Sequence, residues 1–332
     1  MNRRTTINDV AREAGVSVAT VSKAINGRYG VSAETLARVM GVVNELGYES
    51  SIVATSMRRQ RTQVIGVLVA EFEPFALELL RGVSGALENT EYDVLAYAGS
   101  VSAGEHIGWE RRSLSRLGGT LIDGAILVTP TTTPARTSVP MVAVDPHIGT
   151  GDAATVSVGD IHGARAATEH LISLGHHRIA HLRGRTDLES ARKREEGYRL
   201  ALRDAGIPFD ARLVIDGGYR AADSTDGAHA ILDLSDAVTA VFAANDLSAI
   251  EMMRVASERG LHVPADLSVI GFDDIIDAAS HAPQLTTVRQ PLPEMGAAAV
   301  RMLLEIFDGA EPESVQLATT LIVRESTAPP RG

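Results

Sequence analysis

From Gln63 onward, apolar runs rich in β-branched residues alternate with amphipathic stretches of helical periodicity. Strands are predicted at 64–69, 92–98, 124–128, 139–144, 155–158, 178–182, 213–215, 240–243 and 268–272. Helices are predicted at 75–89, 106–117, 161–174, 191–205, 222–232, 247–259 and 293–307. This repeated alternation predicts parallel sheets covered by helices on both faces, and about nine strands over roughly 270 residues suit two sheets better than one. Two such lobes leave a cleft near the carboxyl ends of their strands, where ligands normally bind.

The first 49 residues have a different pattern, which predicts three short helices. Thr6 can cap the first, with Asp9 at the third helical position, and Gly15 ends it. Ser17 can cap a second helix at 18–26. Ser32 opens a third, which Gly47 closes. Its expected apolar stripe consists of Leu36, Val39, Met40, Val43 and Leu46.

The connection Gly15-Val16-Ser17 has the length and composition of the turn in a helix-turn-helix. Glycine permits a left-handed turn conformation, and Val16 can fill the space between the two helices. Short side chains on the second helix would let its backbone approach a major groove closely, and a helix N-terminus favours phosphate. A generic three-helix bundle with a solvated polar face is the alternative from this pattern alone.

The charge is distributed unevenly along the chain. The net charge of -11 argues against nucleic-acid binding when it is taken over the whole sequence. Residues 1–61, however, hold nine basic and five acidic residues, which leaves -15 on the remainder. A basic N-terminal segment on an acidic body indicates that contact with nucleic acid, if any, belongs to that segment.

The segment TINDVAREAGVSVATVSKAINGRYGVSAETLARVMGVVNELGY resembles the N-terminal domain of the lactose-repressor/galactose-repressor (LacI/GalR) family of bacterial transcription factors. The resemblance implies a recognition helix within Ser17 to Asn26, with Val18, Ala19 and Lys23 at base-reading positions. Thr20 and Ser22 would lie nearer the DNA backbone. The full set of expected DNA contacts is Thr6, Ser17, Val18, Ala19, Thr20, Ser22, Lys23, Asn26, Arg28, Ile52, Ala54, Met57 and Arg58.

Residues 50–60, SSIVATSMRRQ, could form one short helix, which is marginal in isolation. In the resembled family the corresponding segment becomes a hinge helix that enters the minor groove, where an apolar side chain wedges between base pairs. Met57 stands at that position, where leucine is usual, and Ser50 and Thr55 replace a usual proline and arginine. An ordinary linker helix is the alternative.

Polar residues follow several predicted strands of the body. Asp145, the pair Asn245-Asp246 and the pair Asp273-Asp274 each stand where a strand ends. Such groups can exchange hydrogen bonds with the hydroxyls of a sugar or nucleoside. Neighbouring residues of an extended chain point to opposite faces, so only one of each pair should enter the cleft. We expect Asp273 to contact ligand, whereas Asp246 or Asp274 could instead cap the next helix.

The body also resembles the effector-binding core of the same family, which shares its fold with periplasmic sugar-binding proteins. The matching segments are HLISLGHHRIAHLRG, SARKREEGYRLAL, AVFAANDLSAI, VPADLSVIGFDD and PQLTTVRQP. The resemblance places Arg194, Asn245 and Asp273 on an effector and gives Phe75 and Tyr219 an apolar or aromatic role beside it. Together with Asp145 these form the expected effector site. Asp160-Ile161 and the acidic Glu71-Phe72-Glu73 depart from the family pattern, which leaves the identity of the effector open.

Other classes of site are disfavoured. His176, His177 and His181 lie on a loop and a strand whose spacing does not bring three imidazoles together, so no metal site is expected. No nucleotide-binding or serine-hydrolase motif and no cysteine is present, so neither a cofactor nor catalysis is expected. Trp109, the only tryptophan, is expected to pack in the core. A free sugar-binding protein or a sugar-processing α/β enzyme remain the alternatives.

The sequence therefore predicts a small all-α helix-turn-helix DNA-binding domain (1–49), a hinge or linker (50–62) and an α/β core of two parallel-sheet lobes (63–332). The first lobe is expected at about 63–160 plus 290–320, and the second at about 161–289 plus a C-terminal strand. The predicted function is a repressor whose affinity for operator DNA responds to a small molecule in the cleft. A homodimer on a pseudo-palindromic operator is expected, in the cytoplasm and with no membrane partner.

Overall fold

The computed structural model divides the chain into two compact units, residues 1–62 and 63–332. It describes residues 5–25, 30–47, 61–99, 108–132, 139–147 and 153–331. None of the helices in these ranges is long and apolar enough to cross a membrane.

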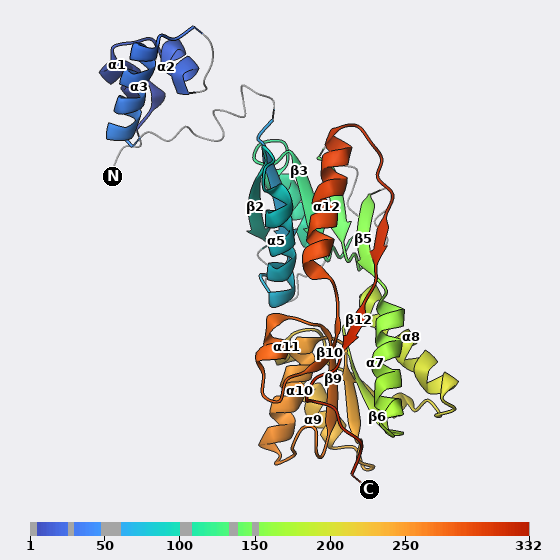
Figure 1. Ribbon diagram of the computed structural model, residues 1–332. Coiled ribbons are helices and arrows are strands. Elements are labelled where there is room, and N and C mark those ends of the chain that lie inside the picture. The colour runs from blue at the N-terminus through green and yellow to red at the C-terminus, as the bar shows by residue number, and fades with distance from the viewer. Residues whose placement is uncertain are drawn as a thin grey trace. The chain divides into compact units, whose positions relative to one another are not determined.

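The N-terminal unit contains three helices, α1 (Ile7–Ala14), α2 (Val18–Ile25) and α3 (Ala33–Glu45) (Figure 1). The predicted caps are present: the Thr6 backbone N–H donates to the Asp9 carboxylate at 3.0 Å, and Ser17 Oγ accepts from the Thr20 N–H at 3.1 Å. Gly15 ends α1 with a φ of 64°, the left-handed conformation expected of it. The turn between α1 and α2 therefore follows from local chemistry.

The core of this unit takes one fully buried valine from each helix, Val10, Val21 and Val39. The predicted apolar stripe of α3 is only partly buried, because Leu36, Met40 and Leu46 remain 39%, 38% and 36% exposed. A three-helix unit this small has too little interior to cover the whole stripe.

The second unit holds two six-stranded sheets, one in each lobe. The first-lobe sheet has the order β11-β5-β4-β3-β1-β2, and all its pairs are parallel. The second-lobe sheet has the order β12-β10-β9-β8-β6-β7 and is parallel except for the pair β10–β12. The first-lobe strands are β1 (Val64–Val69), β2 (Asp93–Ala98), β3 (Gly124–Val128), β4 (Met141–Val144), β5 (Ala154–Val158) and β11 (Val315–Leu317). The second-lobe strands are β6 (Ile179–Arg183), β7 (Val214–Asp216), β8 (Ala240–Ala243), β9 (Ser268–Asp273), β10 (Thr286–Arg289) and β12 (Thr320–Ile322).

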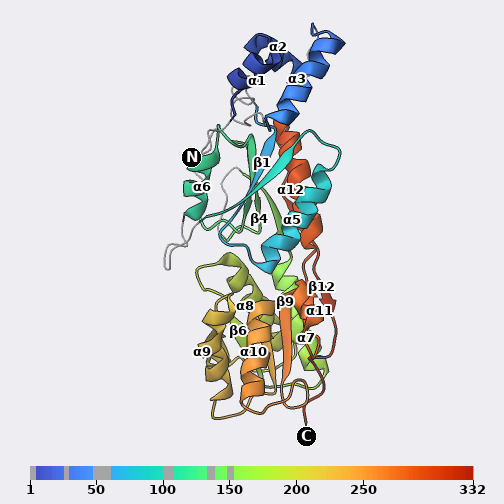
Figure 2. The same ribbon diagram turned by 90° about the vertical axis from the view of Figure 1, so that its left-hand side faces the viewer.

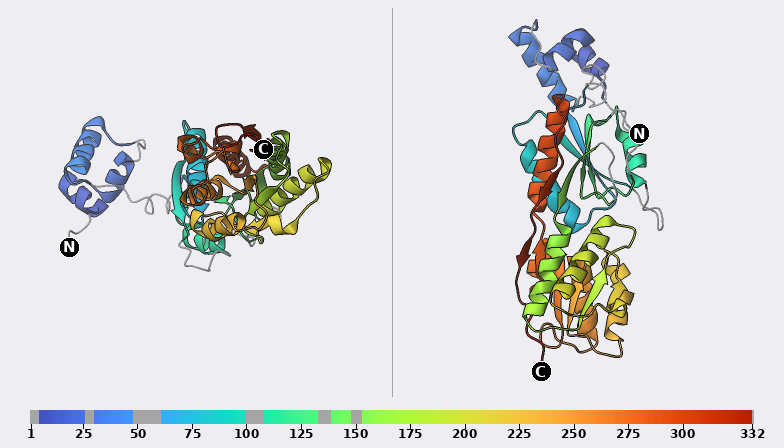
Figure 3. Two further views of the ribbon diagram at one scale, coloured as in Figure 1. Left: turned by 90° about the horizontal axis from the view of Figure 1, so that it is seen from below. Right: turned by 90° about the vertical axis from the view of Figure 1, so that its right-hand side faces the viewer.

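Helices cover both faces of each sheet, as predicted. Alternate strand residues divide between the two faces: Ile65 packs towards α5 (Pro74–Leu87) and α12 (Leu292–Phe307), whereas Leu68 packs towards α6 (Trp109–Leu117). Figures 2 and 3 show α6 on the opposite side of this sheet from α12. In the second lobe, α7 (Asp160–Ser173) and α8 (Glu189–Asp204) cover one face, and α9 (Ala221–Leu232) and α10 (Asp246–Glu258) the other.

Apart from the C-terminal strand expected in the second lobe, the described residues include two strands and one α-helix that the sequence pattern did not predict. These are β10, β11 and the short helix α11 (Ile276–Ser280). The estimate of about nine strands was therefore wrong, since twelve are formed in the described ranges. The chain passes between the lobes after β5, after β10 and between β11 and β12.

Candidate functional site

A pocket of about 190 Å³ lies between the two lobes, at the carboxyl ends of their strands. Val69, Val128 and Asp145 border it at the ends of β1, β3 and β4, and Asn245 and Asp273 border it at the ends of β8 and β9. Parallel strands bring these ends to one edge of each sheet, and that edge faces the other lobe. The cleft predicted from the strand–helix alternation is thus present.

All six residues predicted to contact an effector line this pocket. They come from different elements: Phe75 from the start of α5, Arg194 from α8, Tyr219 from the loop before α9, and Asp145, Asn245 and Asp273 from strand ends. Convergence of residues so far apart in sequence on a single pocket is what a binding site requires.

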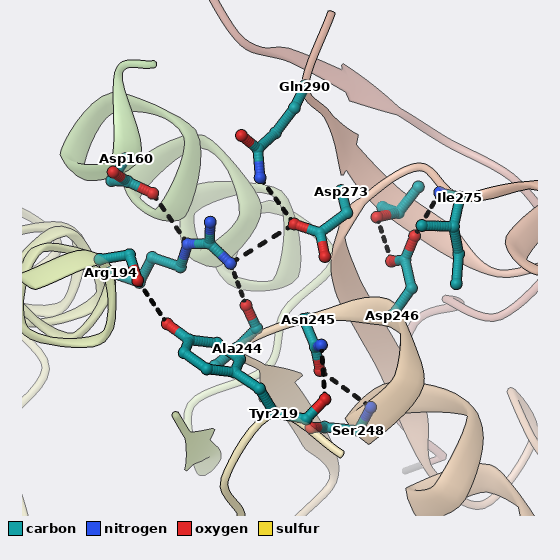
Figure 4. A network of polar contacts seen from close by, with 12 residues as sticks. Asp160, Arg194, Tyr219, Ala244, Asn245, Asp246, Ser248, Asp273, Ile275 and Gln290 are labelled. Atoms are coloured by element: carbon teal, nitrogen blue, oxygen red, sulfur yellow. Dashed lines mark hydrogen bonds and ion pairs between the residues drawn. The ribbon is translucent and has the colours of Figure 1, made fainter. Parts of the chain in front are cut away.

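Arg194 is the centre of the polar network (Figure 4). Its side chain is 3% exposed, and its Nε donates to Asp160 Oδ1 at 2.9 Å while Nη1 donates to the Ala244 carbonyl at 2.6 Å. The guanidinium carbon lies 3.8 Å from the centre of the Phe272 ring. Burial opposes the charge on Arg194, but Tyr219 and the surrounding carboxylates raise its pKa above the ordinary arginine value. Arg194 is therefore a rigid, permanently charged group at the pocket.

Asp273 shares Arg194 with Asp160. Its Oδ1 lies 3.5 Å from Arg194 Nη1 and accepts a 2.7 Å hydrogen bond from Gln290 Nε2. Its φ of 117° is in a region that non-glycine residues rarely adopt, so the strand end is strained where the carboxylate enters the pocket. Burial raises the pKa of Asp273 to about 7, although Arg194 opposes the shift.

The neighbours of the two predicted contacts point elsewhere, as the strand geometry predicted. Asp274 forms ion pairs with Arg289 at 2.6 Å and Arg324 at 2.5 Å. Asp246 accepts from the Ile275 N–H at 2.9 Å, close to the start of α11. The proposal that one of them caps the helix that directly follows it is wrong for Asp246, because Asn245 caps α10 by accepting from the Ser248 N–H at 3.0 Å.

Asn245 has less freedom to meet a ligand than the sequence suggested. Its side-chain oxygen is used by the Ser248 N–H, and its Nδ2 donates to the Tyr219 carbonyl at 2.8 Å. Asn245 lines the pocket, and it also fixes the loop that carries Tyr219. The Tyr219 ring in turn lies against Gly184, where a Cβ atom would come within 2.4 Å of its Cζ. Gly184 is therefore the residue that makes room for this ring.

Asp145 differs from the other carboxylates of the pocket. It is 6% exposed, follows β4 with a φ of 48°, and within the described part of the chain its carboxylate receives no hydrogen bond. Burial raises its pKa, and the nearby charge of Arg194 opposes this. A buried acceptor without a protein partner is a group that a ligand could satisfy.

Glu71 and Glu73, which belong to the acidic segment that departs from the family pattern, contact an arginine at the edge of the pocket. Arg220, at the start of α9, lies 2.6 Å from Glu71 and 3.6 Å from Glu73 through its Nη2 and Nε atoms. The two glutamates follow β1 in the first lobe, so the contact joins the lobes. Burial raises the pKa of Glu73, with Arg220 opposing the shift.

Two of the three histidines that could suggest a metal site have separate hydrogen-bond partners. His176 contacts the Thr239 and Ser268 hydroxyls at 2.8 and 3.1 Å, and His181 bonds the Phe242 carbonyl at 2.9 Å. His177 is exposed. Within the described ranges, no cluster of three or more histidine or carboxylate side chains is arranged to hold a metal ion.

In the N-terminal unit, Ala19 and Lys23 are exposed on α2 and Ser17 is exposed directly before it, while Val21 and Ala24 turn to the core. Val18, Thr20 and Ser22 are half-buried beside them, and Thr6 caps α1. The helix therefore exposes short side chains around one lysine. The expected DNA contacts at Asn26, Arg28, Ile52, Ala54, Met57 and Arg58, and the substitutions at Ser50 and Thr55, lie outside the described residues.

Comparison with known proteins gives the family. Residues 6–51 match the model of the bacterial regulatory proteins of the lacI family, and residues 168–327 match a periplasmic binding protein-like domain. The chain is 33% identical to the ribose operon repressor of Halalkalibacterium halodurans over 97% of both proteins. The chain belongs to the lacI family. Its members bind DNA and regulate transcription, and so does this protein.

Solved structures of lacI-family proteins share the whole architecture. A complex of the transcriptional regulator CelR with cellobiose superposes with a TM-score of 0.70 at 32% identity, over 97% of this chain and 100% of that one. A lac repressor dimer bound to operator and to the anti-inducer ONPF gives a TM-score of 0.79 at 27% identity, over 98% and 100%. These relatives are transcriptional regulators rather than enzymes.

Several residues of this lacI-family pocket were not predicted as contacts. Ser190 Oγ links the Tyr219 hydroxyl at 2.9 Å to His147 Nδ1 at 3.4 Å. Trp109 is 1% exposed and packs in the core as expected, yet it also borders the pocket, and within the described ranges its Nε1 has no hydrogen-bond partner. No local motif marks these positions, because they reach the pocket only when the lobes are assembled.

Proposed function

We propose that this lacI-family protein is a repressor whose affinity for operator DNA is set by a small molecule bound between the lobes of its core. The observation that carries the proposal is the pocket itself. Its groups belong to both lobes, so a ligand that contacts Asp145 on one side and Asp273 on the other binds one interlobe arrangement better than another. Such differential binding is what a ligand needs in order to shift a conformational equilibrium.

DNA contact is assigned to the N-terminal unit. Ala19 and Lys23 project from α2 and would meet base edges, and Ser17 and Thr6 would meet phosphates at helix N-termini. Residues 50–62 act as the hinge, in which Met57 is the proposed wedge between base pairs and Ile52, Ala54 and Arg58 are further contacts. The proposed DNA-contact set is completed by Val18, Thr20, Ser22, Asn26 and Arg28.

The protein is proposed to act as a homodimer on a pseudo-palindromic operator, in the cytoplasm. Two recognition helices on one DNA face need two copies related by a two-fold axis. The lac repressor structure, a dimer on operator, supports this arrangement.

The proposed effector is a sugar or a related hydroxyl-rich molecule. Carboxylates accept from hydroxyl groups, Arg194 donates to them, and the rings of Phe75 and Tyr219 can pack against C–H faces. CelR bound to cellobiose and the ribose operon repressor are relatives whose names concern sugars. No catalytic residue or cofactor is assigned; turnover of candidate sugars on incubation with the protein would contradict this part.

The DNA-binding proposal is tested by selecting duplexes from a random library with the full-length protein. We expect a pseudo-palindromic consensus and an affinity for it that falls steeply with salt. Lys23→Ala should weaken binding by about 1–3 kcal/mol and relax the preference at one base pair of each half-site. Lys193→Ala, on the body, is the matched control and should leave DNA affinity unchanged. Absence of any enriched sequence would refute the proposal.

A further inference from the structure

The charged groups that line the pocket are unequal in number and in use. Among the described residues, five carboxyl groups and three guanidinium groups border the pocket, from Glu71, Glu73, Asp145, Asp223, Asp273, Arg185, Arg194 and Arg220. Whether the pocket attracts or repels a charged ligand depends on which of these groups already form ion pairs within the protein.

Every one of the three arginines is paired with a carboxylate of the protein. Arg185 makes a two-pronged contact with Asp187 at 3.1 and 2.6 Å. Arg194 is held by Asp160 and Asp273, and Arg220 by Glu71 and Glu73, at the distances given above. An anionic ligand would therefore have to displace a carboxylate that already occupies the guanidinium.

The carboxylates of the pocket are not all paired in this way. Asp145 is buried and receives no hydrogen bond within the described residues, although Arg194 lies close enough to influence it. His147, which also lines the pocket, is neutral, because burial lowers its pKa to about 4. Among the residues that the structure describes, no unpaired cation lies beside Asp145 to meet a phosphate or carboxylate in the pocket, and such like-charge contact is a strong basis for rejection.

We propose that the pocket admits a ligand without negative charge that donates a hydrogen bond to Asp145, and that it excludes phosphorylated and carboxylated sugars. This inference rests on the proposed function, because it concerns the effector of the same site. It narrows the ligand class to neutral polyols, with amine-bearing sugars as the charged members that the same chemistry tolerates. Arg220 and its two glutamates are the specificity-determining group at the edge of the pocket, since their ion pairs leave no free positive charge on the described residues there.

Trp109 supplies a local reporter, because it is the only tryptophan of the chain and borders the pocket. We would titrate the full-length protein with sugars that share a ring but differ in charge, following tryptophan fluorescence. The sets are ribose and ribose 5-phosphate; glucose, glucosamine and glucose 6-phosphate; and cellobiose and cellobionate. The anionic members should bind at least about 100-fold more weakly than any neutral or amine member that responds. An anionic member that binds as tightly as its neutral counterpart overturns the proposal.

A double variant provides a second test, which remains decisive if none of these sugars is the effector. Glu71→Gln/Glu73→Gln removes two negative charges beside Arg220 and leaves its guanidinium without a carboxylate partner. This variant should bind inorganic phosphate at least about tenfold more tightly than the wild type does, with the gain lost at high salt. Glu78→Gln, which breaks a pair with Arg81 within α5 at 3.0 Å, is the control and should gain nothing. Failure of the double variant to gain phosphate binding, or phosphate binding by the wild type at equal strength, contradicts the inference.

The two proposals fail in different ways. If neutral sugars bind and leave DNA affinity unchanged, the proposed control of DNA binding is wrong and the charge selectivity stands. If an anionic sugar binds and changes DNA affinity, the control stands and the charge selectivity is wrong.

Discussion

The ion pair between Asp160 and Arg194 gives a prediction about stability. Both side chains are at least 96% buried, and Asp160 does not line the pocket, so Asp160→Ala removes a support of Arg194 without removing a ligand contact. Removing one partner of a buried pair leaves an uncompensated charge, at a cost of about 3–5 kcal/mol. Arg194 retains the Ala244 carbonyl at 2.6 Å and Asp273 at 3.5 Å, so we expect the lower end, about 3 kcal/mol.

The assay is calorimetric unfolding of the ligand-free protein, in which a loss of about 3 kcal/mol lowers the melting temperature of a core this size by about 6–12 °C. Asp204→Ala is the matched control, because Asp204 pairs with Arg165 at 3.2 Å between the same two helices, α7 and α8, but on the surface. A surface pair contributes only about 0–1 kcal/mol. Equal destabilisation by the two variants would refute the view that burial makes the Asp160 pair important.

Three further predictions concern the pocket. Asp145→Asn should weaken binding of a neutral ligand by about tenfold or more, because a hydrogen bond to a charged acceptor contributes about 1.5–3 kcal/mol; an unchanged tryptophan titration would remove Asp145 from the site. Burial raises the pKa of Asp160 to about 6 and of Asp273 to about 7, above the unfolded value of about 3.9, so the folded state binds more protons between these limits. The contribution of each of these carboxyls to the unfolding free energy should therefore fall as pH rises through its window, by up to about 1.4 kcal/mol per pH unit, whereas His147 and His181, whose pKa values burial lowers to about 4, contribute the opposite slope up to about pH 6.5. Asp273→Asn should remove the contribution of Asp273, so the unfolding free energy of the wild type should fall relative to that of the variant as pH rises from about 4 to 7; the same pH dependence in both proteins would contradict the assignment. Gly184→Ala should displace the Tyr219 ring and cost about 1–3 kcal/mol, whereas Gly85→Ala, in open space on α5, should be neutral or slightly stabilising; thermal unfolding of both variants compares them.

Much of the fold could be predicted because several strands carry an unambiguous local signal. The bounds predicted for β1, β3 and β8 are those of the structure, since each is an unbroken apolar run buried on both faces. The strands β10 and β11 were missed, and a C-terminal strand was expected only without bounds, because β10, β11 and β12 are three or four residues long and contain polar residues. They are strands only because neighbouring strands supply their hydrogen bonds, which no local pattern shows.

Some residues of the site could be predicted from the sequence, and others could not. Asp145 and Asp273 could be found from their positions after strands, and Arg194 and Tyr219 from the family resemblance. Asp160 and Ser190 could not be assigned, because their roles depend on the packing of α7 against α8 and on the loop that carries Tyr219. The ion pairs of Arg220 could not be predicted either, because both of its glutamate partners lie in the other lobe. Glu71 is 149 positions earlier in the chain.

The central claim is that occupancy of the interlobe pocket changes affinity for operator DNA. It is tested most directly by the dissociation constant for the selected duplex, measured with and without a ligand that shifts Trp109 fluorescence, for the wild type and Asp273→Ala. We predict a change of at least about tenfold in the wild type, corresponding to about 1.4 kcal/mol of coupling, and no change in Asp273→Ala, which should bind DNA normally. An operator affinity that is the same with and without bound ligand, or an equal response in Asp273→Ala, would contradict the account.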